Sequence, residues 1–165
     1  MTLRFYLVET TLGWIGLVLT PSGLRATTLP HPRRDHALRE VAEMGALEPA
    51  SDAGAAPAAR LVKALADGEP APLAAVIDWD GISGFRRAVM EEALRIPRGE
   101  TRTYGWLAER VGRPRAARAV GRVMATNPLP IVVPCHRVIG SDGSLRGYGA
   151  GLPMKAALLR AEGVR

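Results

Sequence analysis

The hydrophobic pattern of the chain changes type near residue 80, and this change limits the fold more than any other feature. Before it, residues 3–9 (LRFYLVE) and 14–19 (WIGLVL) are rich in β-branched and aromatic residues, with TTLG between them, which is typical of a hairpin. After it, apolar residues recur at helical spacing. The sequence therefore predicts an α/β (α+β) chain with a small antiparallel-sheet domain over 1–80 and a mostly helical domain over 81–165.

The first half of the chain indicates a supporting α/β domain and little more. PSG at 21–23 turns the chain toward a third strand, and residues 35–47 form a weak helical pattern. Alanine, proline and glycine dominate residues 46–57, a composition that predicts a surface loop. A short helix is expected to follow and to end at Gly68.

Charge is divided unevenly between the two halves. Residues 1–85 hold 7 Lys and Arg against 10 Asp and Glu, whereas residues 86–165 hold 15 against 6. Positive charge confined to one half is typical of a chain that binds a polyanion such as nucleic acid. A basic face without a function is the alternative that charge alone leaves open.

Composition excludes several classes of protein. No run of about 18 apolar residues is present, so we expect no membrane-spanning helix. The N-terminus lacks the layout of a signal peptide, and one cysteine cannot form an internal disulfide, which fits a reducing cytoplasm. Three histidines and one cysteine make a zinc site improbable. We therefore expect a cytoplasmic protein without metal or cofactor. We also expect it to be a monomer.

Two short helical segments in the second half are separated by a glycine and proline turn. The first covers residues 103–111 and ends at Gly112; the second, AARAVGRVMATN, follows RPR. Its buried face is predicted from the i, i+3, i+4, i+7 spacing of Ala116, Ala119, Val120 and Val123. On another face, a sector of about 60° holds Arg115, Arg118 and Arg122.

Such a pair of helices, the second with an arginine stripe, predicts a helix-turn-helix that contacts DNA. An amphipathic helix with a solvated arginine face is the alternative reading of the same pattern.

The only cysteine of the chain, Cys135, lies in NPLPIVVPCHRVIG between a proline and His136. Three prolines in seven residues fix the backbone ahead of it, which favours a pre-positioned segment over a mobile loop. A neighbouring base favours the thiolate, the nucleophilic form of a thiol, and Arg137 adds a positive charge. A small buried cysteine without chemistry is the alternative.

A catalytic base is usually oriented by a third group, most often a carboxylate. Glu162 is a notable candidate because it falls in the last turn of a helix predicted from GLPMKAALLRAEGVR. A carboxylate at that position opposes the helix dipole by about 0.3–1 kcal/mol, and a buried partner such as His136 would explain it. A solvated surface glutamate is the alternative.

A glycine-rich segment, GSDGSLRGYGAG, lies between Cys135 and this helix. Its composition predicts a mobile loop that closes over a flat substrate, with Tyr148 as one wall. An ordinary connecting loop is the other reading.

Together, RAVGRVMATNPLPIVVPCHRVIG, GYGAG and LLRAEG resemble the O6-alkylguanine-DNA alkyltransferases, the suicidal DNA repair proteins. The Pro-Cys-His-Arg tetrapeptide preceded by Asn-Pro is the active-site signature of that family. The resemblance is strong over residues 85–163 and weaker over 1–80. The resemblance implies that double-stranded DNA containing O6-alkylguanine is the partner. It also implies one irreversible transfer of the alkyl group to Cys135 after the nucleotide is flipped.

The resemblance also implies roles for further residues. His136 would act as a base through a water and Glu162 would orient it. Asn127 would brace the active-site turn, and Tyr104 would help to rotate the nucleotide and hydrogen-bond the guanine. Arg118 would enter the base stack as a finger, flanked by the DNA-binding Arg115 and Arg122. The substrate pocket would contain Met124, Val138, Tyr148 and Gly149.

The chain departs from the family pattern at three points. Gly149 stands where many relatives have serine, so only its backbone can serve the guanine oxygen. The zinc ligands of some relatives are missing, and Met90 replaces a tryptophan common in bacterial members, which we interpret as a change in core packing.

Other classes of function remain as alternatives. A module that binds alkylguanine without repair would not need the acceptor Cys135. A helix-turn-helix transcription regulator with a structural cysteine would bind a specific DNA sequence, and a Cys-His hydrolase would turn over and need an oxyanion hole.

Overall fold

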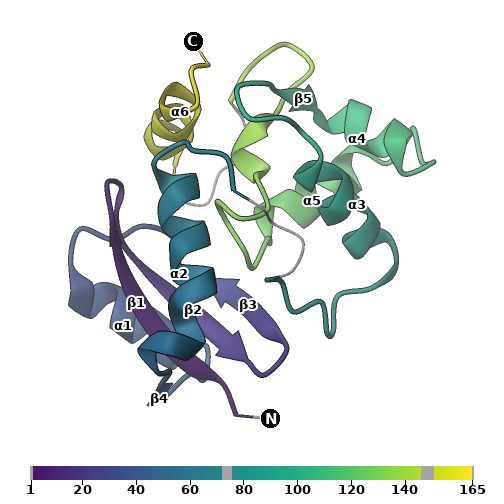
Figure 1. Ribbon diagram of the computed structural model, residues 1–165. Coiled ribbons are helices and arrows are strands. Elements are labelled where there is room, and N and C mark those ends of the chain that lie inside the picture. The colour runs from purple at the N-terminus through teal and green to yellow at the C-terminus, as the bar shows by residue number, and fades with distance from the viewer. Residues whose placement is uncertain (1, 72–75, 146–150, 165) are drawn as a thin grey trace. The chain divides into compact units, whose positions relative to one another are not determined.

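The computed structural model describes residues 2–71, 76–145 and 151–164, and it divides the chain into two compact units (Figure 1). The first unit is Met1–Asp80 and the second is Gly81–Arg165. Each unit contains helices and a small β-sheet, so the predicted mixed α/β class is confirmed. Among the described residues, no helix has the length and apolar character needed to cross a membrane.

The first unit is built on a four-stranded sheet with the order β3-β2-β1-β4. Its elements are β1 (Arg4–Thr10), β2 (Gly13–Thr20), β3 (Gly23–Thr27), α1 (Arg34–Glu43), β4 (Glu48–Pro49) and α2 (Asp52–Ala66). The first three strands form the predicted antiparallel meander, and the short β4 pairs with β1 in parallel. Figure 1 shows α1 and α2 packed against this sheet.

Strand β2 is central, and five consecutive residues of it are buried. At Gly16 an added Cβ would lie 2.4 Å from Cγ1 of Val41 in α1, so only glycine lets this helix lie so close to the strand. Ile15 and Leu17 are fully buried, and burying such a side chain contributes about 1.5–3 kcal/mol. The core of this unit therefore depends on the close contact of α1 with β2.

Residues 46–57 are not the loop that composition predicted, because α2 begins at Asp52. The Ser51 side chain accepts a hydrogen bond from the Gly54 amide at 3.0 Å and caps the helix. Alanine has the highest helix propensity, and Pro57 removes only one helical hydrogen bond. Alanine-rich composition was thus read as a loop when the cap and the alanines favour a helix.

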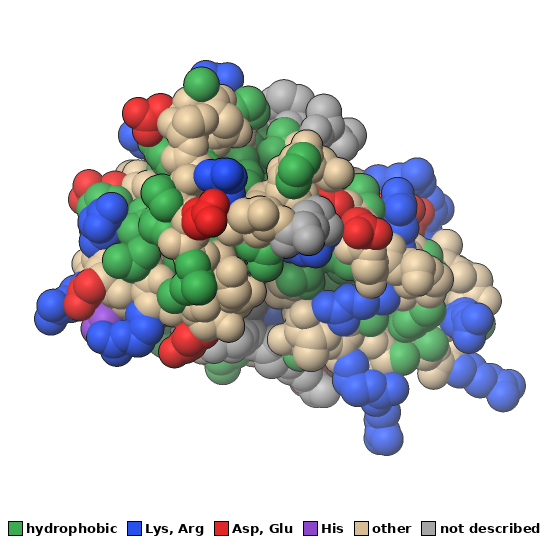
Figure 2. All heavy atoms as spheres, turned by 90° about the horizontal axis from the view of Figure 1, so that it is seen from below, with side chains coloured by type: hydrophobic (Ala, Val, Ile, Leu, Met, Phe, Trp, Pro, Cys, Tyr) green, Lys and Arg blue, Asp and Glu red, His purple; other side chains and the backbone are tan. Residues whose placement is uncertain are grey.

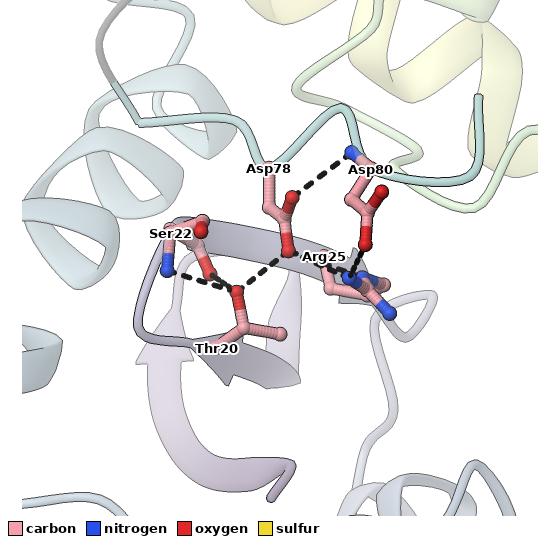
Figure 3. Close-up of polar contacts among 6 residues, drawn as sticks. Thr20, Ser22, Arg25, Asp78 and Asp80 are labelled. Carbon is pink, nitrogen blue, oxygen red and sulfur yellow. Dashed lines mark hydrogen bonds and ion pairs between the residues drawn. The ribbon is translucent and has the colours of Figure 1, made fainter. Parts of the chain in front are cut away.

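A buried carboxylate fixes the last residues of this unit to β3. The Asp78 carboxylate accepts hydrogen bonds from Thr20 Oγ1 at 2.6 Å and from Arg25 Nη2 at 2.8 Å (Figure 3). Two backbone hydrogen bonds join the same segment to Leu24 of β3. The Leu24 amide donates to the Val76 carbonyl, and the Asp78 amide donates to the Leu24 carbonyl. Burial raises the pKa of Asp78, but these bonds outweigh it and hold the pKa below its ordinary value.

The second unit is mostly helical. Its elements are α3 (Gly84–Leu94), β5 (Arg102–Thr103), α4 (Tyr104–Arg110), α5 (Ala117–Ala125), the 3-10 helix η1 (Cys135–Arg137), β6 (Val138–Ile139) and α6 (Leu152–Ala161). The two short strands pair in parallel, with Arg102 opposite Val138, so the strand that follows η1 lies beside the strand that leads into α4. Met90, which stands where a tryptophan was expected from the family, is fully buried in α3.

Helices α4 and α5 are joined by a turn that contains Gly112 at φ +77°. Arg118 and Arg122 lie on α5 and are exposed, whereas Arg115 lies in the turn before Ala117. The predicted three-residue stripe on one helix is therefore wrong for Arg115, because this residue lies in the turn that contains Pro114 and the helix begins only at Ala117. Figure 2 shows blue Lys and Arg side chains projecting on the right, the side that α4 and α5 occupy in Figure 1.

Candidate active site

Cys135 begins the 3-10 helix η1 at the end of a braced turn. The Asn127 side chain accepts a hydrogen bond from the Leu129 amide and donates one to the Val133 carbonyl, both at 2.9 Å. The Val133 amide closes the turn on the Leu129 carbonyl at 2.8 Å. Only 5% of Cys135 is exposed. One side chain, Asn127, thus fixes the segment that presents the sulfur.

Backbone strain is concentrated in this turn. Ile131 has φ +75°, the left-handed region that β-branched residues rarely adopt. Such a conformation costs on the order of 1–3 kcal/mol and persists only where the surroundings hold it. The Ile131 side chain is 2% exposed, so its burial and the Asn127 bonds offset the cost.

Glu162 receives hydrogen bonds from both residues that follow the cysteine. His136 Nε2 lies 2.9 Å from Oε1, while Arg137 Nη2 and Nε donate to Oε1 and Oε2 at 2.7 and 2.8 Å. Arg137 Nη1 also donates to the Ile96 carbonyl at 2.8 Å. All three charged or polar side chains are buried. Two buried partners explain why a carboxylate caps the C-terminus of α6, where the dipole opposes it.

The carboxylate is ionised and the imidazole is neutral. Burial raises the pKa of Glu162, but the bonds from His136 and Arg137 outweigh it and bring the pKa to about 2. Burial lowers the pKa of His136 below its ordinary value although Glu162 pulls it upward. A neutral ring that donates its Nε2 proton to Glu162 keeps a lone pair on Nδ1. That buried Nδ1 has no hydrogen-bond partner among the described residues.

The cysteine is protonated in this environment. Burial raises the pKa of Cys135, and a hydrogen bond from Asn127 and the charge of Lys155 lower it only in part. We expected Arg137 to favour the thiolate, but its guanidinium is hydrogen-bonded to Glu162. The positive charge that acts on the sulfur is instead that of Lys155.

Lys155 is the site residue that our sequence reasoning missed. It lies in α6, is 1% exposed, and donates from Nζ to the Val138 carbonyl at 2.6 Å. The sequence did carry a signal, because Lys155 shares a helix face with Leu158, Leu159 and Glu162 at i+3, i+4 and i+7. A lysine on an apolar face either extends to solvent or serves a buried acceptor.

The remaining residues that we predicted for the site fall into three groups. Tyr104 is the half-buried first residue of α4, and Met124 is buried near the end of α5. Val138 is buried in β6, where its carbonyl accepts the Lys155 hydrogen bond. Tyr148 and Gly149 lie outside the described residues.

The depressed pKa of Glu162 predicts how stability varies with pH. The ionised carboxylate stabilises the folded chain fully above its ordinary pKa of 4.5, and this contribution is lost as pH falls toward about 2. We expect Glu162→Gln to lower the free energy of unfolding by about 3 kcal/mol at pH 7, and to lack this part of the acid slope. Urea unfolding between pH 7 and pH 2.5 measures both. The control is Glu109→Gln, an exposed glutamate of α4; identical acid slopes in wild type and Glu162→Gln would contradict the assignment.

Removal of the Lys155 charge should make the thiol harder to ionise. In Lys155→Met, which keeps an unbranched side chain one atom shorter and removes the charge, we expect the Cys135 titration to move to higher pH. Alkylation by iodoacetamide at pH 7.5 should slow on the order of tenfold, the usual effect of losing a charged group from a buried site. Arg160→Met removes the same charge from an exposed position of α6 and should change neither. Equal titrations for the two variants would refute a role for Lys155.

The sequence of the second unit matches known proteins. A family model for the DNA binding domain of 6-O-methylguanine DNA methyltransferase covers residues 84–164. A methylated-DNA–protein-cysteine methyltransferase of Mycobacterium leprae is 52% identical over 95 residues, 58% of this chain and 57% of that protein. One of Methanosarcina acetivorans is 52% identical over 79 residues, 48% of this chain and 51% of that protein. These matches thus span only about half of the curated relatives.

Solved structures extend the likeness to both units. The crystal structure of Mycobacterium tuberculosis O6-methylguanine methyltransferase has a TM-score of 0.79 and 33% identity, over 98% of this chain and 93% of that one. A structure of the same bacterium's protein in complex with DNA has a TM-score of 0.75 and 34% identity, over 98% of this chain and 92% of that one. The crystal structure of the methyltransferase from Pyrococcus kodakaraensis has a TM-score of 0.74 and 26% identity, over 99% of this chain and 100% of that one. The resemblance inferred from the Pro-Cys-His-Arg motif is confirmed, and the chain belongs to the O6-methylguanine-DNA methyltransferase family.

Proposed function

We propose that this protein repairs alkylated DNA directly, by one irreversible transfer of an alkyl group from guanine O6 to Cys135 Sγ. The observation that carries the proposal is the buried Cys135 next to a neutral His136 that is hydrogen-bonded to the ionised Glu162. The related proteins are named as methyltransferases that act from methylated DNA to a protein cysteine, and one of them is solved with DNA.

The substrate has to leave the DNA duplex before it can react. Guanine O6 lies inside the base stack, and the sulfur of Cys135, a residue that is only 5% exposed, cannot reach it there. Extrusion costs a few kcal/mol, which a side chain inserted into the gap can partly offset. Arg118, exposed on α5, is long enough for this and can hydrogen-bond to the orphaned base.

The two helices α4 and α5 act in this proposal as a helix-turn-helix that docks in the minor groove. Arg122 from α5 and Arg115 from the preceding turn are exposed and neutralise phosphates. Tyr104, the first residue of α4, helps to rotate the nucleotide and hydrogen-bonds the guanine.

The transfer begins with a neutral thiol and a neutral imidazole. His136 Nδ1 takes the Cys135 proton through a water, and Glu162 stabilises the resulting imidazolium. Lys155 lies close enough to lower the thiol pKa, so it stabilises the thiolate that forms. The thiolate then attacks the alkyl carbon, an S–C bond forms, and the C–O bond to guanine breaks. The departing guanine accepts a proton from the Tyr104 hydroxyl. The proton held on His136 then returns Tyr104 to its neutral form.

Each protein molecule reacts once in this proposal, because the product cannot be reversed. A thioether has no good leaving group, and the 165 residues contain no second cysteine that could accept the alkyl group. The protein is thus consumed in a stoichiometric reaction. One chain holds the acceptor, the base and the DNA-docking helices, so we propose that it acts as a monomer. An acceptor thiol has to stay reduced, which fits the cytoplasm.

Transfer of label tests this function. Incubation with duplex DNA that carries a labelled methyl group on guanine O6 should move one label per protein to Cys135. Cys135→Ser should accept none and still bind the duplex. Label that stays on the DNA would favour a non-repairing alkylguanine-binding protein or a helix-turn-helix regulator, and many products per protein would favour a turning-over enzyme.

The finger role of Arg118 predicts a difference between two substrates. Arg118→Ala should slow repair in duplex DNA roughly 30-fold, since a few kcal/mol of extrusion is no longer offset. Transfer from the free alkylguanine base needs no extrusion and should change less than about twofold. Arg60→Ala, an exposed arginine of α2, controls for net charge. Equal losses on both substrates would argue against the finger.

A further inference from the structure

The C-terminal end of α5 is held by an arginine from another helix. Arg86 Nη1 donates to Thr126 Oγ1 at 2.9 Å, and Arg86 Nη2 donates to the Thr126 carbonyl at 2.5 Å. Thr126 is the C-cap of α5, and its hydroxyl donates in turn to the Arg122 carbonyl at 2.8 Å. The guanidinium therefore binds both the hydroxyl and the carbonyl of the residue that caps this helix.

The position of Arg86 makes sense only for α5. It lies in the first turn of α3, which contains no acidic residue. A cation there opposes the dipole of its own helix, whereas a cation at a helix C-terminus is favourable by about 0.3–1 kcal/mol. The charge of Arg86 is thus unfavourable at the start of α3 and favourable at the end of α5.

Thr126 joins two parts of the site. The residue before it ends α5, the helix that carries Arg118 and Met124. The residue after it is Asn127, which braces the turn ahead of Cys135 through two hydrogen bonds. No flexible residue separates these functions, so a displacement of Thr126 also displaces the Asn127 side chain.

We propose that Arg86 is a positioning residue for alkyl transfer: by holding Thr126 it fixes Asn127, and through it the turn that presents Cys135. This inference rests on the function proposed above. It assigns the reaction a residue that touches neither the substrate nor the sulfur, and it places a link between the DNA-docking helix and the acceptor.

The matched pair Arg86→Ala and Arg87→Ala tests the proposal. Both variants remove one positive charge from the first turns of α3, but Arg87 pairs with Glu91 of its own helix at 2.9 Å. We expect Arg86→Ala to slow transfer about tenfold, the effect of losing charged hydrogen bonds, on duplex and on free O6-methylguanine base alike. DNA affinity should stay within about twofold of Arg87→Ala, because the Arg86 donors are directed at Thr126.

A second measurement does not need DNA. The Asn127 hydrogen bond lowers the pKa of Cys135, so Arg86→Ala should shift the iodoacetamide titration of the thiol to higher pH. Arg86→Lys, which can still donate to the Thr126 carbonyl, should restore part of the shift, and Arg87→Ala should cause none. A loss of thermal stability alone would leave this titration unchanged.

Three results would overturn the inference. They are equal transfer rates and titrations for Arg86→Ala and Arg87→Ala, a loss of DNA affinity with an unchanged rate at saturating DNA, and a change confined to the melting temperature. If wild type transfers no methyl group while the titration still shifts in Arg86→Ala, the proposed function fails, and only the effect of Arg86 on the turn before Cys135 stands.

Discussion

The hydrogen bonds of one buried carboxylate hold the second unit together. Glu162 binds His136 and Arg137, and Arg137 extends the contact to the carbonyl of Ile96 at the end of α3. Loss of the carboxylate would leave a guanidinium and an imidazole buried without their anion, which costs far more than a surface ion pair. Three segments distant in sequence therefore meet at an ion that also sets the tautomer of the proposed base.

The same burial keeps the proposed acceptor, Cys135, in its unreactive thiol form. A low-dielectric surrounding raises the pKa of Cys135 and lowers that of His136, so the resting pair is thiol and imidazole. A resting thiolate would react with other electrophiles, and under the proposed single-use mechanism each such reaction would consume one protein molecule. The charge of Lys155, whose Nζ is held on the Val138 carbonyl, lowers the pKa of Cys135 in part and so favours the thiolate.

Much of this could be predicted from the sequence, and the errors have physical causes. The hydrogen bond between His136 and Glu162 follows from asking why a carboxylate ends α6. Lys155 was missed because a lysine is assumed to reach solvent, although its apolar helix face indicated otherwise. The role of Arg137 was misjudged since adjacency along the chain does not show which acceptor a long side chain reaches. Composition alone misread residues 46–57, where Ser51 starts a helix.

The turn before Cys135 shows why rigidity is preferred to low strain here. Glycine at position 131 would adopt φ +75° without cost, yet it would leave an unfilled core position and a looser turn. Displacement reactions need the attacking atom held close to its line of approach, and errors of about 1 Å cost large factors in rate. Ile131 is buried in the strained conformation, and Asn127 bonds both ends of the turn. A buried Ile131 in an unfavourable backbone conformation, in a turn held by the Asn127 side-chain amide, therefore defines the position of the sulfur better than a relaxed glycine would.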